Sequence, residues 1–255
     1  MSVVLEVRDL QKAYGGVKAV QGVSFDVHAG ELLALIGPNG AGKTTCFNLL
    51  NGQLAADHGE VRFDGRSIRG LPPRDIWRLG VGRTFQITAT FASMTVRENV
   101  QMALLSHHRR ISSWWSRATQ MFATEADALL ERVGMRAQAA RHCAVLAYGD
   151  LKRVELAVAL ANAPRLLLMD EPTAGMAPRE RQALMQLTAD LARDLGIAVL
   201  FTEHDMDVVF RHANRVIVLA AGELIAQGTP SEVRANPSVQ AVYLGSGATY
   251  GATHD

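Results

Sequence analysis

Apolar residues gather into short, nearly continuous runs in the first third of the chain and again after residue 164. Residues 31–36, 165–171 and 197–202 are runs of this kind. Apolar runs of this length without alternation are typical of strands that are buried on both faces, as in parallel sheets. Shorter β-rich runs predict further strands at 3–7, 24–28 and 61–65.

Apolar positions spaced three and four residues apart predict helices between these strands. At 179–195 such a stripe is formed by Leu184, Leu187, Leu191 and Leu195. Because strands and helices alternate along the chain, we expect a parallel sheet with helices on its faces.

The pattern from residue 95 to residue 163 is helical. Thr124 and Asp127 predict a helix cap, and Gly134 predicts the end of the same helix. The organisation that we expect is a single domain, 1–255, with a catalytic lobe at 1–94 and 164–255 and an inserted helical lobe at 95–163.

The C-terminal part predicts a hairpin from strands at 216–220 and 223–226. The capping box Thr229-Pro230-Ser231-Glu232 follows, with proline at the first helical position, so we expect a last short helix there.

Composition and charge narrow the function classes. With 48% hydrophobic and 20% charged residues, the chain has the composition of a soluble globular protein, and its net charge of +1 gives no reason to expect a nucleic-acid partner. No apolar run reaches the ~20 residues that span a bilayer. We therefore expect a cytoplasmic chain whose link to a membrane comes through a partner. Two cysteines, Cys46 and Cys143, fit a reducing compartment and predict buried small side chains.

A glycine-rich loop follows the run at 31–36. It reads Gly37-Pro38-Asn39-Gly40-Ala41-Gly42-Lys43-Thr44-Thr45 and matches the pattern G-x-x-x-x-G-K-[ST]. Its backbone N–H groups are expected to face a polyphosphate, with Lys43 on the terminal phosphates and the Thr44 hydroxyl on Mg²⁺. Residues 46–50 continue the helix that this loop opens, so the phosphate would lie at a helix N-terminus.

Two acids end the run at 165–171. We expect Asp170 to sit near Mg²⁺ at the strand tip and Glu171 to act as general base on the attacking water. A strand that ends in two acids is, by itself, weak evidence for a nucleotide site. The glycine loop earlier in the chain makes this interpretation specific.

Further segments complete a recognisable order of motifs: Gly82-Arg83-Thr84-Phe85-Gln86, Leu146-Ala147-Tyr148-Gly149, Ala174-Gly175-Met176 and Thr202-Glu203-His204-Asp205. With the glycine loop and the acidic strand end, they resemble the ATP-binding subunit of ABC transporters over nearly the whole chain. The resemblance is strongest to the ATPases of bacterial importers for branched-chain amino acids and related hydrophobic or amide substrates.

This resemblance implies an α/β fold of the P-loop NTPase class, with a RecA-like parallel sheet core, an N-terminal antiparallel β subdomain and an inserted α-helical subdomain. It implies ATP and Mg²⁺ as ligands. Tyr14 would stack on adenine, Gln86 would contact Mg²⁺ and the attacking water, and His204 would reach the γ-phosphate. The implied catalytic residues are Glu171, His204 and Gln86, and the implied magnesium ligands are Thr44, Gln86 and Asp170.

The resemblance also implies a composite site. Ala147, Tyr148 and Gly149 would offer N–H groups to a nucleotide bound on another subunit. Here the sequence departs from the common Leu-Ser-Gly-Gly-Gln pattern, because Ala147 lacks the serine hydroxyl and Asp150 adds a negative charge. Ala177 also replaces the acid that usually ends the loop after the acidic strand.

The implied partners are a related but distinct ATPase, with a homodimer as the alternative, two transmembrane permease subunits and, indirectly, an extracytoplasmic solute-binding protein. Residues 87–96 would touch the membrane partner at the cytoplasmic face of the bacterial inner membrane. Two alternatives stay open: an ATPase of a lipopolysaccharide-export system and a non-transport ABC ATPase. The solute is not predicted, because no residue here would touch it.

Overall fold

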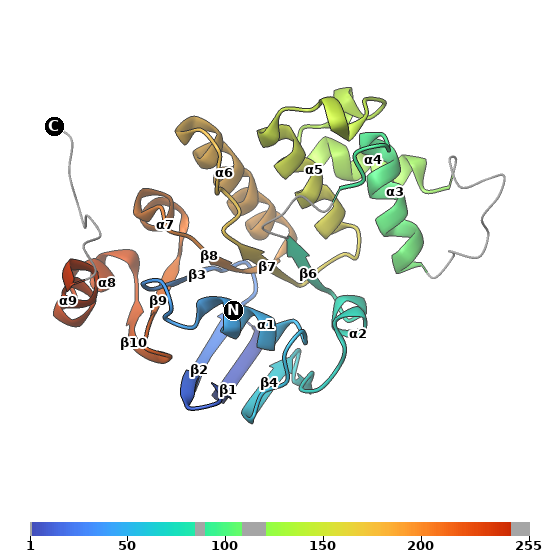
Figure 1. Cartoon of the computed structure of the whole chain (residues 1–255). Coiled ribbons are helices and arrows are strands. Elements are labelled where there is room, and N and C mark those ends of the chain that lie inside the picture. The colour runs from blue at the N-terminus through green and yellow to red at the C-terminus, as the bar shows by residue number, and fades with distance from the viewer. Residues whose placement is uncertain (1, 85–89, 109–120, 246–255) are drawn as a thin grey trace, which may run out of the picture.

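The computed structural model describes residues 2–84, 90–108 and 121–245, and Figure 1 shows its two sheets and surrounding helices. Strand β3 (Leu32–Ile36) lies inside a six-stranded sheet of order β10-β9-β3-β8-β7-β6. All neighbouring pairs in it are parallel except β9 with β10. The other strands of this sheet are β6 (Val81–Thr84), β7 (Leu166–Asp170), β8 (Ala198–Thr202), β9 (Arg215–Ala220) and β10 (Glu223–Gly228). The expected parallel sheet and C-terminal hairpin are thus confirmed.

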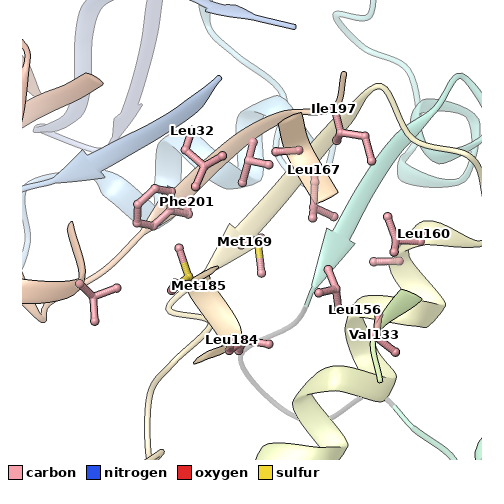
Figure 2. Close-up of a cluster of buried hydrophobic side chains, with 14 of the residues drawn as sticks. Leu32, Val133, Leu156, Leu160, Leu167, Met169, Leu184, Met185, Ile197 and Phe201 are labelled. Atoms are coloured by element: carbon pink, nitrogen blue, oxygen red, sulfur yellow. The ribbon is translucent and has the colours of Figure 1, made fainter. Parts of the chain in front are cut away.

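Alternate residues of the central strands enter two different cores. Leu32 and Ala34 of β3 pack in the cluster that contains the helices on one face of the sheet. Leu33 and Leu35 pack in the second cluster, with the first helix of the chain and the antiparallel strands. Figure 2 shows the first cluster, where Leu167 of β7 lies among helical side chains. Burial on both faces explains why these strands read as unbroken apolar runs.

The second sheet has the order β2-β1-β4-β5 and confirms the expected antiparallel subdomain. It consists of β1 (Val3–Tyr14), β2 (Val17–His28), β4 (His58–Phe63) and β5 (Arg66–Ser67). Strands β1 and β2 run well beyond the predicted 3–7 and 24–28. The pairing register shifts between Val7 and Leu10, and Asp9 there has a φ of 47°, so the bulge breaks the pattern on which the prediction depended.

The helices cover both faces of the six-stranded sheet (Figure 1). Their bounds are α1 (Lys43–Leu50), α2 (Pro73–Arg78), α3 (Val96–His107), α4 (Ala123–Arg132), α5 (Tyr148–Leu160), α6 (Pro178–Leu195), α7 (Met206–His212), α8 (Pro230–Ala235) and α9 (Pro237–Gly245), with short 3-10 turns at Arg136–Gln138 and Cys143–Val145. The capping box at Thr229 and Glu232 is present at the start of α8, as predicted. Helix α9 was not expected.

Two local predictions were wrong. Thr124 does not cap a helix, because α4 already begins at Ala123 and the Ala126 N–H donates to the Phe122 carbonyl. Asp127 instead pairs with Arg97 and Arg136. Gly134 does end this helix region, with a φ of 71°.

The stripe on α6 also ends earlier than predicted. Leu184 is buried and Leu187 and Leu191 are half-buried against the core, but Leu195 is exposed at the C-terminal end of the helix. The buried face continues instead through Thr188 and Ala192. The last turn of α6 therefore extends past the edge of the core.

Helices α3, α4 and α5 lie between β6 and β7 in the chain, and the division into lobes at residues 95 and 163 stays a prediction. Both cysteines are buried as expected, and burial raises the pKa of the Cys46 thiol to about 12. Within the described ranges, no helix has the length and apolar character needed to cross a bilayer.

Candidate active site

The glycine loop connects the carboxyl end of β3 to α1 and fits tightly against neighbouring backbone. A Cβ on Gly37 would lie 2.2 Å from the Leu219 carbonyl oxygen, and one on Gly42 would lie 2.2 Å from that of Ala19. Gly42 also has a φ of 100°, a conformation that L side chains rarely adopt. The Gly222 N–H donates to the Ala41 carbonyl from the turn between β9 and β10. The loop shape is therefore fixed by strands that lie far away in the sequence.

Lys43 is the first residue of α1, and its ammonium group is held inside the loop. Its Nζ donates to the carbonyls of Gly37 at 2.7 Å and Pro38 at 3.1 Å. Burial lowers the pKa of Lys43, although the nearby carboxylates of Asp170 and Glu171 act in the opposite direction. A buried cation next to the unpaired first amides of a helix is suited to an anion. The loop thus fits the polyphosphate that its sequence predicts.

Asp170 lies at the carboxyl end of β7, opposite Thr202 of β8. The Thr202 hydroxyl donates to Asp170 Oδ1 at 2.7 Å, and both residues are buried. This bond fixes the orientation of the carboxylate. Mg²⁺ in nucleotide sites takes one or two carboxylates together with phosphate oxygens, so Asp170 and the exposed Thr44 suit such an ion. Over the ranges that the structure covers, no group of three His, Cys, Asp or Glu side chains forms a metal site.

Glu171 follows β7 in a left-handed conformation, with a φ of 48°. Its N–H donates to two oxygens of Thr202, the carbonyl at 3.2 Å and the hydroxyl at 3.0 Å. Its Oε1 lies 2.7 Å from Nε2 of His204. The His204 side chain is half exposed and that of Glu171 is 23% exposed, so the pair is open to solvent. The structure brings together two of the three predicted catalytic residues.

The third predicted catalytic residue, Gln86, lies outside the described residues. Its roles toward Mg²⁺ and the attacking water stay predictions.

Two acids on either side of His204 were not assigned a role from the sequence. The Glu203 carboxylate is buried and accepts hydrogen bonds from the Thr173 N–H, the Thr173 hydroxyl and the His204 N–H. Asp205 caps α7 by accepting from the N–H groups of Asp207 and Val208. The run Thr202-Glu203-His204-Asp205 was the available signal, but the sequence does not say which backbone donors its acids meet.

Tyr14 ends β1 beside a two-residue turn, and it is 48% exposed. Its strand partner β2 carries Ala19, the residue that packs against Gly42 of the glycine loop. The tyrosine is thus presented on the hairpin that supports the phosphate loop. Its stacking on adenine stays a prediction.

Helix α5 begins at Tyr148, so that Tyr148 and Gly149 lie in its first turn. Ala147 is the N-cap residue and makes no side-chain cap bond, as expected for a residue without a hydroxyl. Both Ala147 and Tyr148 are exposed. Gly175 lies beside the Tyr148 ring, because a Cβ placed on this glycine would be 3.5 Å from Cε1 of the tyrosine.

Comparison with known proteins decides the family. The family model "ABC transporter" matches residues 20–174. The chain belongs to the ABC transporter family. A second model, "Branched-chain amino acid ATP-binding cassette transporter", matches residues 223–249, which include β10, α8 and α9.

The high-affinity branched-chain amino acid transport ATP-binding protein LivG of Salmonella typhimurium is 38% identical over 252 residues, which is 95% of this chain and 98% of that protein. A solved ATP-binding cassette of an ABC transporter in its ADP conformation is 30% identical, has a TM-score of 0.84 and covers 96% of this chain and 100% of its own. A dimeric ATP-binding cassette in a post-hydrolysis state, with ADP and Pi, is 26% identical with a TM-score of 0.75, over 89% of this chain and 98% of its own. The chain is accordingly an ATP hydrolase of the ABC type.

Proposed function

We propose that this chain is the ATP-hydrolysing subunit of a bacterial importer for branched-chain amino acids or a related small solute. The observation that carries the chemistry is the Glu171–His204 contact at the end of the sheet that also presents Lys43 and Asp170. The observation that supports the cargo class is the C-terminal match at 223–249, together with the LivG relative. This match also favours the importer over the lipopolysaccharide-export and non-transport alternatives.

Each residue of the site has a part in hydrolysis. Bound Mg·ATP supplies the phosphoryl group and the metal charge that balances its oxygens. Lys43 and the first amides of α1 would hold the phosphates, while Thr44 and Asp170 would hold the metal. Glu171 accepts a proton from the attacking water, and His204 orients its carboxylate through the contact between Nε2 and Oε1. The two neighbouring acids have different partners, because Asp170 accepts from the Thr202 hydroxyl and Glu171 contacts His204, and we assign them different roles.

The active form of the protein is a dimer in this proposal. Ala147 and Tyr148 are exposed at the start of α5, where the first amides of the helix lack intrahelical acceptors. Such a terminus suits the phosphate of a nucleotide held by a second ATPase, which is a distinct relative or another copy of this chain. The dimeric cassette with ADP and Pi supports this arrangement.

The membrane contact is proposed at a cavity of about 300 Å³ between α2, β6, α3 and α5. Its walls are mainly apolar, and Ile76, Trp77, Val81, Ala103 and Ala159 contribute to them. Its charged lining residues are Arg74 and Arg83, which suit a loop that carries an acidic side chain. Strand β6 precedes the 87–96 segment in the chain, and residues 87–89 of that segment lie outside the described residues. We place a cytoplasmic loop of a permease subunit here, at the cytoplasmic face of the inner membrane.

A trapping experiment tests the importer assignment. The Glu171→Gln variant is tagged in its native host, held with Mg·ATP, extracted from solubilised membranes and analysed by mass spectrometry. We expect two multi-span membrane proteins and a second short ATPase to co-purify. Recovery from the soluble fraction alone, or with nucleic-acid factors, would show that the protein is not an importer subunit.

Two variants, each with an alanine replaced by tryptophan, test the docking site. Ala103→Trp fills the cavity, whereas Ala183→Trp places the same side chain on an exposed position of α6. We expect only Ala103→Trp to lose the membrane proteins while it still binds ATP. Equal recovery by both variants would exclude this cavity as the docking site.

A further inference from the structure

Arg181 connects the loop after Glu171 to the residue that follows His204. It lies in the first part of α6, and its Nε donates to the Met176 carbonyl at 2.7 Å. Its Nη1 donates to Asp205 Oδ2, also at 2.7 Å. We propose that Arg181 is a positioning residue for ATP hydrolysis, which holds His204 in register with the loop at residues 174–177.

Arginine suits this place because its planar guanidinium presents donors in a fixed fork. Nε donates to the Met176 carbonyl and Nη1 donates to the Asp205 carboxylate. The distance between these two acceptors is therefore set by one rigid group. A lysine ammonium is a point charge on a flexible stem and does not impose this spacing. Met176 itself is buried, so the accepting carbonyl belongs to a well-packed segment.

Asp205 passes this restraint on to His204. Its Oδ2 meets Arg181, while its Oδ1 accepts from the N–H groups of Asp207 and Val208 at the start of α7. On the other side, Glu203 holds the His204 N–H at 3.2 Å and also binds Thr173. The backbone of His204 is therefore restrained on both sides, and its ring reaches Glu171 from this fixed base.

The opposite end of the connection reaches the start of α5. The ring of Tyr148 lies beside Gly175, which is in the same loop as Met176, because a Cβ placed on Gly175 would be 3.5 Å from Cε1 of the tyrosine. A displacement of this loop therefore moves the carbonyl that Arg181 holds, and with it Asp205 and His204. Arg181 is the side chain through which the loop 174–177 acts on the Glu171–His204 pair.

Steady-state kinetics of Arg181→Gln test this role. The matched control is Arg193→Gln, because Arg193 lies on the same helix and pairs only with exposed Asp190 and Asp194 among the residues described. We expect Arg181→Gln to lower kcat about 10-fold, in the range of coupling effects of this kind, with the KM for Mg·ATP and the nucleotide Kd within about twofold. Arg193→Gln should leave all three constants unchanged. A normal kcat for Arg181→Gln would overturn the proposal, even if its melting temperature fell.

A double-mutant cycle with Asp205→Asn separates positioning from folding. Asparagine caps helices as well as aspartate does, so α7 keeps its cap, while the ion pair with Arg181 is lost. We expect Asp205→Asn to lower kcat about as much as Arg181→Gln, and the double variant to lose no more than either single variant. Arg181→Lys should recover only part of the rate. Additive losses in kcat, or losses shared equally by nucleotide affinity, would contradict the proposal.

Discussion

Glu171 and His204 contact each other directly, with 2.7 Å between Oε1 and Nε2, although they follow different strands. Strands β7 and β8 are neighbours in parallel register, so their carboxyl ends bring these two residues to one edge of the sheet. Glu171 has a positive φ of 48°. A non-glycine residue in this conformation carries a cost that functional sites tolerate when the surrounding bonds enforce it.

Glu171→Gln should abolish most hydrolysis and leave ATP binding intact. Glutamine keeps the size of the side chain but does not take a proton from water, and loss of a general base costs about 10²- to 10⁴-fold in rate. Phosphate release and nucleotide binding measure the two effects. Glu223→Gln, at an exposed site on β10, is the control and should behave like the wild type. Full-speed hydrolysis by Glu171→Gln would remove this residue from its proposed role.

Lys43→Ala should weaken ATP binding about 10- to 100-fold, because hydrogen bonds from charged groups contribute about 1.5–3 kcal/mol. The fold should persist, since Nζ bonds only to carbonyls of its own loop among the described contacts. Nucleotide titration measures the affinity, and the control is Arg193→Ala, which removes a surface cation that pairs with Asp190 and Asp194. Equal affinities of the two variants would contradict the assigned role of Lys43.

Gly42→Ala should destabilise the fold more than Gly70→Ala does. Both positions have a positive φ, of 100° and 75°, so each substitution brings backbone strain of about 1–3 kcal/mol. Only at Gly42 would the new Cβ also meet a backbone carbonyl, at 2.2 Å, whereas Gly70 has open space around it. Chemical denaturation gives the two unfolding free energies, and ATP titration should show lost binding for Gly42→Ala alone. Equal losses of unfolding free energy in the two variants would mean that the loop can shift to accommodate the new Cβ at residue 42.

The free energy of unfolding should fall as the pH drops below about 4.5, partly through Glu31. Burial alone would raise the pKa of this carboxyl, but hydrogen bonds from Arg215 and His28 more than offset it and lower the pKa below 4.5. A carboxyl with a lowered pKa in the folded state stabilises the fold above its unfolded pKa, and this contribution is lost as the pH falls through the folded value.

Glu31→Gln isolates this contribution. At pH 7 it should cost about 2–3 kcal/mol, because it removes the charged partner of Arg215. The difference from the wild type should shrink as the pH falls below about 4.5 and Glu31 becomes protonated. Urea denaturation across this range measures the effect, and Glu223→Gln again provides an exposed control. A difference that stays constant with pH would contradict the predicted shift.

Much of the fold follows from local pattern. Strands β3, β7 and β8 are uniformly apolar, and each is buried along its full length, so composition alone indicates them. The box at the start of α8 has the same readable form as Thr95 and Glu98 at the start of α3, which was overlooked although the pattern was present. Sequence motifs likewise place Lys43, Asp170, Glu171 and His204 at the site.

Contacts between distant segments were beyond the sequence. Nothing in the spacing of Arg181 and Asp205 shows that one guanidinium bridges them, because the contact depends on how α6 packs beside α7. The partners of Asp127 were likewise not predictable, since Arg97 and Arg136 engage its carboxylate in place of the expected cap. Local sequence propensity cannot predict contacts that form only when distant segments pack together.

The turn between β9 and β10 has a consequence for how the protein is made. The phosphate loop leaves the ribosome early. The Leu219 carbonyl, which lies against Gly37, and the Gly222 N–H, which donates to Ala41, are synthesised much later. A nascent chain that ends before residue 222 lacks the backing that shapes the loop, even though it already contains every residue that would touch the phosphates. We therefore expect nucleotide affinity to arise late in translation, so that ATP would bind a finished chain more tightly than one truncated before residue 222.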